Sequence, residues 1–296
     1  MELREFANKV VETLVKEHDS LFEIKEIIKN NGTKVTGIII RADKNTVIAP
    51  TIYIDDCYVR GLSVDATAEK IWERYENSMK NDITQIDPNK FLNFDSVRND
   101  IVFQLINTEH NKALLTDLPH ADWNDLSIIF EILVQSEECL SANIKITNDM
   151  LKSWNLDINE LYSTATENTP KLAPAVVQNI AGALKEMNLL DEDDLDFEVE
   201  SVPMFVLSNK TKINGAGVLL YPEVLKKFSD MIQGDFYILP SSIHETILLP
   251  DKENDHDIEY LKNMVYEINR TQVDACEVLS DSVYKYCRDT DTVIVC

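Results

Sequence analysis

The sequence predicts an α+β fold in which antiparallel sheets are flanked by amphipathic helices. Helices are predicted where apolar residues recur every three or four positions, because such residues share one helix face. Strands are predicted where short apolar runs end at turn residues, as on both sides of Asn31 and Gly32. That dipeptide tolerates the positive φ of a hairpin turn. Helices combined with such hairpins are typical of this class.

Residues 1–90 are predicted to form an N-terminal α+β unit that ends in the polar segment 81–90. The buried face of an opening helix is expected to consist of Leu3, Phe6, Ala7, Val10 and Leu14. Strands are expected from about residue 21, over 35–40 and over 51–54. The helix is therefore expected to pack on a sheet.

A second helix of this unit is expected to begin at Ser63 or Asp65, since either side chain can cap a helix N-terminus. Its expected buried face consists of Ala68, Ile71, Trp72, Tyr75 and Met79. Both Ile71 and Trp72 are accordingly predicted to lie in the core.

Residues 91–296 are predicted to form a larger C-terminal α+β region. Strands are expected over 101–106 and 127–134, with the polar stretch 107–124 forming a short helix and loop between them. A strand over 142–146 is expected to pair with the second of these.

The chain then turns helical, around 148–154, from residue 158, and again after Pro174. Proline suits a first helical turn because its missing N–H has no partner there.

Two β-β-α segments are expected in the C-terminal region, at about 126–170 and 203–271. The runs ANIKITNDMLKSW and AGVLLYPEVLKKF align without gaps as strand, junction and helix, and another strand precedes each. Asn214 and Gly215 are interpreted as the hairpin turn before the second run. Duplication and chance similarity both remain open.

Net charge is the unusual feature of the composition, with 52 acidic against 28 basic residues and a formal charge of −24. Such a field repels nucleic-acid backbones and anionic membranes, so no direct binding to DNA, RNA or a membrane is expected. The charge either serves solubility or mimics a nucleic acid. The densest stretch, 191–200, is interpreted as a loop followed by a strand with one carboxylate face.

A cytoplasmic location is predicted. The N-terminal residues mix acids and bases with apolar residues, unlike a signal peptide. Apolar runs fall short of the roughly 18 residues that a membrane span needs. The five cysteines show no CxxC spacing, so we expect reduced thiols and no zinc site.

The catalytic candidates follow the apolar run FYILP and are Ser241, Ser242, His244 and Glu245. If this stretch joins two strands, Ser242 and His244 project to the same side, where a hydroxyl beside an imidazole suits nucleophilic catalysis. No nucleophile elbow or Gly-rich oxyanion loop accompanies them. The alternative is a structural turn whose hydroxyls satisfy local backbone groups, with His244 on the sheet surface.

The binding candidates in the polar stretch are His110, Asn111, His120 and Asp122. They form a pocket only if tertiary contacts bring them together. No two histidines have the spacing that places two ligands on one helix face, so no metal site is predicted. The run from Gly215 to Gly217 lacks the residues of a phosphate-binding loop, so no nucleotide and no cofactor is expected.

The most specific part of the chain is the stretch 204–251, which combines FVLSN, GAGVLLYPEVL and FYILPSSIHE. Together with GTKVTGIII, APTIYID and FQLINTEHNKALLTDLPHADWNDLSIIFEI, it resembles a bacterial family catalogued only as a domain of unknown function. That family occurs in low-GC anaerobes (Firmicutes), often near mobile-element genes. The resemblance implies a fold and a source, and it supplies no catalytic residue.

The leading functional hypothesis is a non-enzymatic cytoplasmic interaction or regulatory protein with a protein partner. The hypothesis includes a role in the service of a mobile element. A first alternative is a hydrolase or transferase centred on Ser242, His244 and Glu245. A second is an acidic nucleic-acid mimic that inhibits a basic partner.

Overall fold

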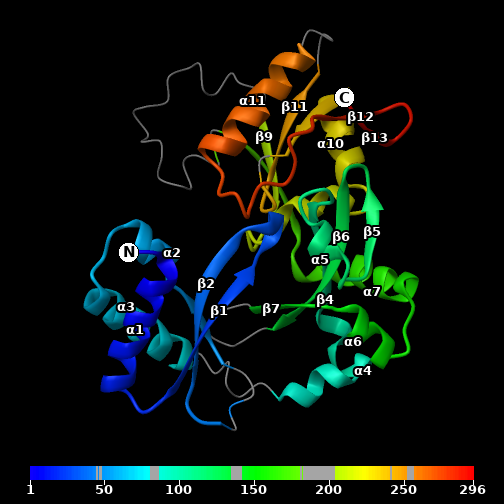
Figure 1. Cartoon of the computed structure of the whole chain (residues 1–296). Helices are drawn as coiled ribbons and strands as arrows, with labels where there is room; N and C mark the ends of the chain where they lie inside the picture. The colour runs from blue at the N-terminus through cyan, green and yellow to red at the C-terminus, as the bar shows by residue number, and fades with distance from the viewer. Residues whose placement is uncertain are drawn as a thin grey trace. The chain divides into compact units, whose positions relative to one another are not determined.

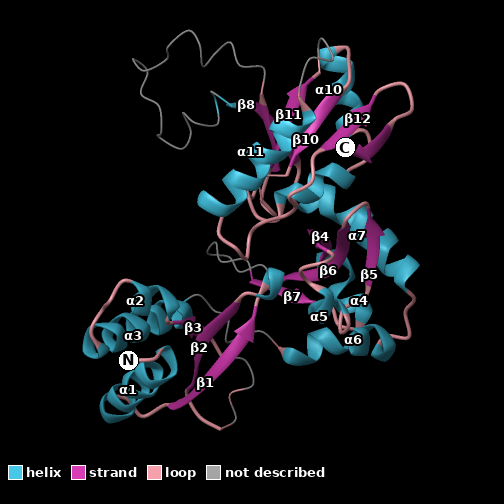
Figure 2. Cartoon of the chain, turned by 45° about the horizontal axis from the view of Figure 1, so that its top comes forward, coloured by secondary structure: helices cyan, strands magenta, loops and turns pink. Residues whose placement is uncertain are grey.

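The computed structural model describes residues 1–44, 46, 49–80, 87–134, 142–180, 182, 204–240, 242–251 and 257–296 (Figures 1 and 2). Helices accompany three antiparallel sheets, so the predicted α+β class is confirmed. The chain divides into two compact units, Met1–Val97 with Leu133–Asn143, and Arg98–Ile132 with Ile144–Cys296. The predicted domain boundary near residue 90 stays a prediction.

The first unit contains a three-stranded sheet in the order β1-β2-β3. Its helices and strands are α1 (Leu3–Glu17), β1 (Leu21–Ile28), β2 (Lys34–Arg41), β3 (Thr51–Tyr53), α2 (Asp55–Val59), α3 (Val64–Lys80) and α4 (Phe94–Val97). Asn31 and Gly32 adopt positive φ between β1 and β2, as the hairpin prediction requires.

The core of the first unit lies between α1, α3 and the sheet, and it includes Phe6, Val10, Ile38 and Ile71. Ser63, the first of the two predicted caps, accepts a hydrogen bond from the N–H of Ala66. The prediction is confirmed for Ile71, which is fully buried.

The prediction that Trp72 lies in the core is wrong, because this side chain is only half-buried. Its indole stacks on the imidazole of His18, with ring centroids 3.4 Å apart, and its Nε1–H donates to Glu76. The indole therefore covers the edge of the core and keeps its polar group in contact with polar neighbours.

The second unit holds a four-stranded sheet, β4-β6-β5 with β7 also paired to β6, and a six-stranded sheet, β13-β12-β10-β11-β9-β8. The strands are β4 (Ile101–Asn107), β5 (His120–Trp123), β6 (Leu126–Val134), β7 (Ala142–Lys145), β8 (Ala175–Asn179), β9 (Phe205–Asn209), β10 (Phe236–Leu239), β11 (Thr246–Pro250), β12 (Tyr284–Cys287) and β13 (Thr292–Val295). The α-helices are α5 (Lys112–Leu115), α6 (Asn148–Ser153), α7 (Ile158–Leu172), α10 (Val224–Ile232) and α11 (Ile258–Thr271).

A helix covers each face of the six-stranded sheet (Figure 2). On one face, Phe228 of α10 packs edge-on against Phe236, which in turn stacks on Tyr286. On the other face, Leu261 of α11 joins a core cluster with Tyr237. Because successive side chains of a strand point to opposite faces, Phe236 and Tyr237 belong to two different cores.

Two secondary-structure predictions are wrong because a predicted helix or loop is a paired strand in the structure. The stretch predicted as helix and loop contains α5 but also β5, which pairs with β6 through a turn at Asn124 (φ 54°). The helix expected after Pro174 is instead β8, which pairs antiparallel with β9. The β-branched pair Val176 and Val177 favours this extended conformation.

The first β-β-α segment is confirmed by β6, β7 and α6. In the second, the stretch Gly215–Leu220, predicted as a strand, is the 3₁₀-helix η5. Asn214 before it has left-handed backbone angles, and a Cβ on Gly215 would lie 2.3 Å from the backbone oxygen of His244. Within 203–271, β10, β11 and α11 form the β-β-α succession. The strand expected within 191–200 falls outside the described residues.

Candidate functional site

Ser242 lies in the turn between β10 and β11, and its polar groups stabilise that turn. Its hydroxyl oxygen accepts a hydrogen bond from the N–H of His244 (3.0 Å), and its own N–H donates to the carbonyl of Glu245 (3.1 Å). Ser242 is only 8% exposed. The hydroxyl of Ser242 therefore bonds a local backbone group, as expected if the stretch is a structural turn. Ser241 lies outside the described residues.

The imidazole of His244 contacts groups other than a serine hydroxyl. Its Nδ1 accepts a hydrogen bond from the N–H of Asn214 (3.1 Å), which places the proton of the neutral ring on Nε2. Nε2 lies 3.5 Å from a carboxylate oxygen of Glu277. The hydroxyl of Ser208 donates to the backbone carbonyl of His244, whose N–H donates to the hydroxyl of Ser242. These contacts hold the imidazole and the backbone of His244 in place within the turn.

A buried carboxylate supports the same region. Glu131, in the middle of β6, has a side chain only 2% exposed, and its Oε1 lies 2.7 Å from Nζ of Lys145. Its Oε2 accepts from the side-chain amide of Asn214 (3.1 Å), so Asn214 joins Glu131 to His244. A carboxylate buried in this way needs an opposite charge and hydrogen-bond donors as partners. The signal in the sequence was a single Glu within the apolar run SIIFEILV.

The four predicted binding residues serve two separate local structures. Asn111 is buried, and its side-chain amide donates to the carbonyl of Asn107, whose own side-chain oxygen accepts from the N–H of the exposed His110. His120 lies on β5 with Nδ1 2.9 Å from the carbonyl oxygen of Leu118, and Asp122 is exposed two residues later.

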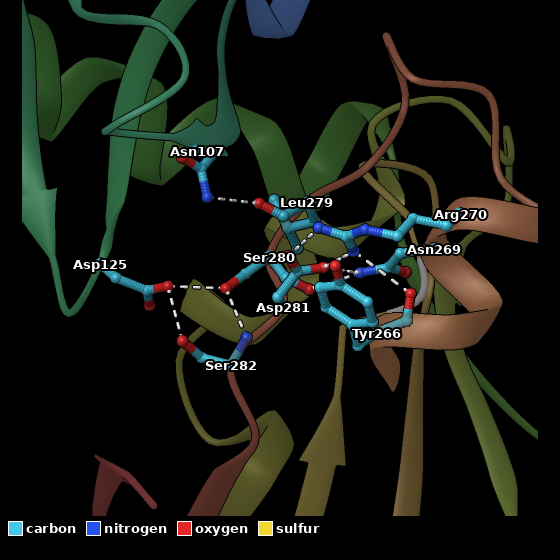
Figure 3. Close-up of polar contacts among 9 residues, drawn as sticks. All are labelled: Asn107, Asp125, Tyr266, Asn269, Arg270, Leu279, Ser280, Asp281 and Ser282. Atoms are coloured by element: carbon cyan, nitrogen blue, oxygen red, sulfur yellow. Dashed lines mark hydrogen bonds and ion pairs between the residues drawn. The ribbon is translucent and has the colours of Figure 1, made fainter. Parts of the chain in front are cut away.

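A polar network beyond these residues fastens the segment 279–282 (Figure 3). The carboxylate of Asp125 accepts from the hydroxyls of Ser280 (2.6 Å) and Ser282 (3.0 Å). Its other oxygen accepts from the hydroxyl of Tyr284 (2.6 Å). Burial and the charge of Asp125 raise the pKa of Tyr284, so the phenol stays neutral and donates.

The other side of this segment is held by α11 (Figure 3). Asn269 donates to the carbonyl of Ser280, and the two terminal guanidinium nitrogens of Arg270 donate to the carboxylate of Asp281. Burial alone would raise the pKa of Asp281, but hydrogen bonds from Arg270 and Asn269 lower it overall. Arg270 also lies over the ring of Tyr266, 3.3 Å from its centroid.

Next to this network lies a pocket of about 330 Å³. Trp123 lies two residues before Asp125, and its ring contacts that of Tyr284, with the ring centroids 5.7 Å apart. The pocket is lined by Trp123, Leu219, Tyr221, Glu223, Leu225, Lys226, Tyr286, Asp291, Thr292 and Val293. We call it the aromatic pocket. None of the catalytic and binding candidates named from the sequence lines it, although half of its lining residues lie in the run AGVLLYPEVLKKF.

Residues 3–288 match a family model described as a family of unknown function, DUF5688. The chain belongs to this family. The predicted resemblance to a domain of unknown function is thereby confirmed. No curated protein and no solved structure matches the chain.

The aromatic pocket of this DUF5688 member has buried walls and a charged rim. Tyr221, Tyr286, Leu219 and Leu225 are buried, whereas Glu223, Lys226 and Asp291 are exposed. The hydroxyl of Tyr221 donates to the carbonyl of Ala173 (2.8 Å), and burial raises its pKa. The phenol is therefore neutral at physiological pH.

Negative charge surrounds Tyr286 in the pocket wall. Its hydroxyl donates to Asp291, and its pKa is raised first by burial, then by that hydrogen bond and by the charges of Asp291, Asp230 and Glu223. Glu223 and Asp291 both have left-handed backbone angles. In the described part of the chain, the carboxylate of Glu223 has no hydrogen-bonding or ionic partner.

Metal-binding side chains do not gather in the part of the DUF5688 chain that the structure describes: no group of three or more His, Cys, Asp or Glu could hold an ion there. In the same residues, no helix is long and apolar enough to cross a bilayer. The aromatic pocket itself presents aromatic rings and carboxylates.

Proposed function

We propose that this protein is a non-enzymatic interaction protein that binds a positively charged side chain of a partner protein in the aromatic pocket. The observation that carries the proposal is the composition of the pocket, in which three aromatic residues stand beside two rim carboxylates. Aromatic faces attract cations, and this attraction grows when the cation is desolvated.

The charges around the pocket support a cationic ligand. Glu223 and Asp291 oppose the single rim cation, Lys226, and the charge of Asp230 also reaches Tyr286. At a larger scale, the formal charge of −24 attracts basic partners and accelerates their encounter with the protein. The same charge disfavours nucleic acid as the ligand.

The arrangement at Ser242 supports a non-enzymatic role. The hydroxyl accepts from the backbone of His244, and the imidazole Nδ1 accepts from the backbone of Asn214. Nucleophilic catalysis by this pair would require the hydroxyl of Ser242 to donate to an imidazole nitrogen, whereas Nδ1 already accepts from Asn214 and Nε2 carries the proton of the neutral ring. The hydrolase alternative thus has less support than the binding role.

The biological setting belongs to the same proposal. A cytoplasmic location, a bacterial (Firmicutes) source and association with mobile elements are what the family resemblance and the composition imply. A regulatory protein of this kind would act by holding a basic partner.

The proposal is tested by adding a blocked Gly-Arg-Gly peptide to ¹⁵N-labelled protein and following the indole N–H signals of its three tryptophans. We expect the Trp123 signal, assigned with Trp123→Phe, to shift with the arginine peptide and not with its uncharged citrulline counterpart. Glu223→Gln combined with Asp291→Asn should abolish the shift, whereas Asp122→Asn, at an exposed carboxylate outside the pocket, should leave it unchanged. Equal shifts with arginine and citrulline would refute a cation-binding pocket.

A further inference from the structure

The strand next to the aromatic pocket lies at an open sheet edge in the part of the chain that the structure describes. β13 is the terminal strand of the six-stranded sheet, and among the described residues it pairs only with β12 (Figure 1). Ile294 is 48% exposed and Val295 45% exposed. Proteins commonly protect such edges with charges, proline or bulges, and the strand sequence TVIV has none of these.

The register shows which backbone groups face outward. Cys296 donates its N–H to the carbonyl of Val283, and the pairing continues with Val295 opposite Tyr284 and Val293 opposite Tyr286. Directly opposed pairs in an antiparallel ladder alternate between bonded and non-bonded. The N–H and C=O groups of Val293 and Val295 therefore point away from β12, toward the open edge.

The pocket lies on a face of this same edge. Val293 is paired with Tyr286, so both side chains point to one face of the sheet, and both line the pocket. Asp291 and Thr292, at the start of β13, complete that side of it. A strand added beside Val293 would direct alternate side chains to the face on which the pocket opens.

We propose that the partner binds as an extended segment that adds a strand to β13 and places an arginine side chain in the aromatic pocket. In this mode of recognition, main-chain hydrogen bonds supply affinity and a side-chain pocket supplies specificity. The arginine half of this inference rests on the proposed function, and the strand-addition half rests on the open edge alone.

Arginine fits the pocket better than lysine. A guanidinium stacks flat on aromatic rings and donates in a planar fork to carboxylates, whereas an ammonium is a compact and strongly hydrated charge. Oδ1 of Asp291 is already bonded to Tyr286, which leaves Oδ2 available together with the carboxylate of Glu223. The partly exposed indole of Trp123 offers a ring for stacking, and these oxygens accept the N–H groups of the guanidinium.

The test uses the blocked peptide STVRVTS, its citrulline counterpart, and titration calorimetry with the full chain. Val295→Pro removes one outward N–H and leaves the bonded positions of β13 intact. We expect this variant to bind STVRVTS about fivefold to tenfold more weakly, the loss of one main-chain hydrogen bond. Val295→Ala retains the N–H and should bind like the unaltered protein.

A second measurement covers the case in which Val295→Pro does not fold. The unaltered protein is titrated with STVRVTS that is N-methylated at alternate residues, in both registers, so that the edge-facing N–H groups are blocked. One register should bind several-fold more weakly than the other, since only one face of an added strand bonds to β13.

The outcomes separate the two halves of the inference. If the protein distinguishes arginine from citrulline but neither Val295→Pro nor N-methylation weakens binding, strand addition is overturned. The proposed function is then left standing. Sensitivity to both edge changes without arginine discrimination would overturn the arginine assignment and the proposed function together. If sedimentation equilibrium found a dimer that Val295→Pro dissociates, the occupant of the edge would be a second copy of this chain, and the inference would be wrong.

Discussion

The hydroxyl of Tyr284 donates a 2.6 Å hydrogen bond to the carboxylate of Asp125, a residue 159 positions earlier in the chain. The same carboxylate holds the hydroxyls of Ser280 and Ser282. Asp125 belongs to the turn between β5 and β6, so these bonds fasten the tip of one sheet to the start of β12 in another. Trp123, in the same hairpin, is thereby positioned at the aromatic pocket.

Asp125→Ala is expected to lower the free energy of unfolding by about 2–3 kcal/mol, because three hydroxyls lose an ionised acceptor. Urea denaturation followed by circular dichroism provides the measurement. Asp122→Ala, at an exposed position on the adjoining strand, should stay within about 0.5 kcal/mol of the unaltered protein. Equal stabilities of the two variants would mean that the network contributes little.

Gly215→Ala is expected to destabilise the protein by about 1–3 kcal/mol or more, since overpacking a tight contact forces the backbone to move. A Cβ at this position would lie 2.2 Å from the hydroxyl oxygen of Ser208 and 2.3 Å from the backbone oxygen of His244. Gly234 is the matched control, because a Cβ there meets nothing within 4 Å. Gly234→Ala should be neutral or slightly stabilising in thermal denaturation, and a comparable loss at both sites would contradict the close approach at Gly215.

Local patterns were sufficient to predict the elements whose stability depends on neighbouring residues. The three- and four-residue spacing of Phe6, Val10 and Leu14 predicted the buried face of α1. Asn31 and Gly32 predicted the first hairpin because their backbone conformation is intrinsic to those residues. The α+β class follows from such local signals.

Long-range pairing was not predictable in the same way. The stretch AVVQN of β8 becomes a strand through its register with β9, about thirty residues away in sequence. Asp125 gave no signal because its hydroxyl partners lie in a segment with ordinary turn composition. The pocket unites residues of the β5–β6 hairpin, η5, α10 and the β12–β13 hairpin, none of which carries a motif alone.

Substitution of neighbouring residues on α3 should separate a core position from a peripheral one. Ile71→Ala is expected to cost about 2–5 kcal/mol, the usual range for a fully buried aliphatic side chain. Trp72→Ala is expected to cost less, about 1–3 kcal/mol, because the half-buried indole exposes part of its surface in the folded state. Denaturant unfolding of the two variants gives the comparison, and a larger loss for Trp72→Ala would show that its stacking on His18 outweighs the core contact.

The Asp56–Arg74 pair should contribute to the acid stability of the first unit. Two hydrogen bonds from Arg74 lower the pKa of Asp56 to about 2 from an ordinary value of 3.8. A carboxyl with a lowered folded-state pKa stabilises the fold fully above its unfolded value, and that contribution is lost as pH falls through the folded value. The contribution is modest, since the Asp56 side chain is 37% exposed to screening solvent.

The stability difference between the unaltered protein and Asp56→Asn should therefore be constant above about pH 5 and should shrink between about pH 4 and pH 2. Urea titrations at a series of pH values measure it. Glu69→Gln, at an exposed position of α3, controls for the loss of one negative charge. A difference that grows toward low pH would reverse the expected sign and refute the ion pair.

Ser242→Ala is expected to lower stability by roughly 1 kcal/mol, the typical net contribution of one hydrogen bond, because the N–H of His244 loses its acceptor. The same variant should leave unchanged any turnover found in a screen of esterase, peptidase and phosphatase substrates. Ser208→Ala is the matched comparison, since its hydroxyl donates to the carbonyl of the same histidine and should cost a similar amount. Turnover abolished by both Ser242→Ala and His244→Ala in folded protein would require the two side chains to face each other, and the hydrolase interpretation would then replace the structural one.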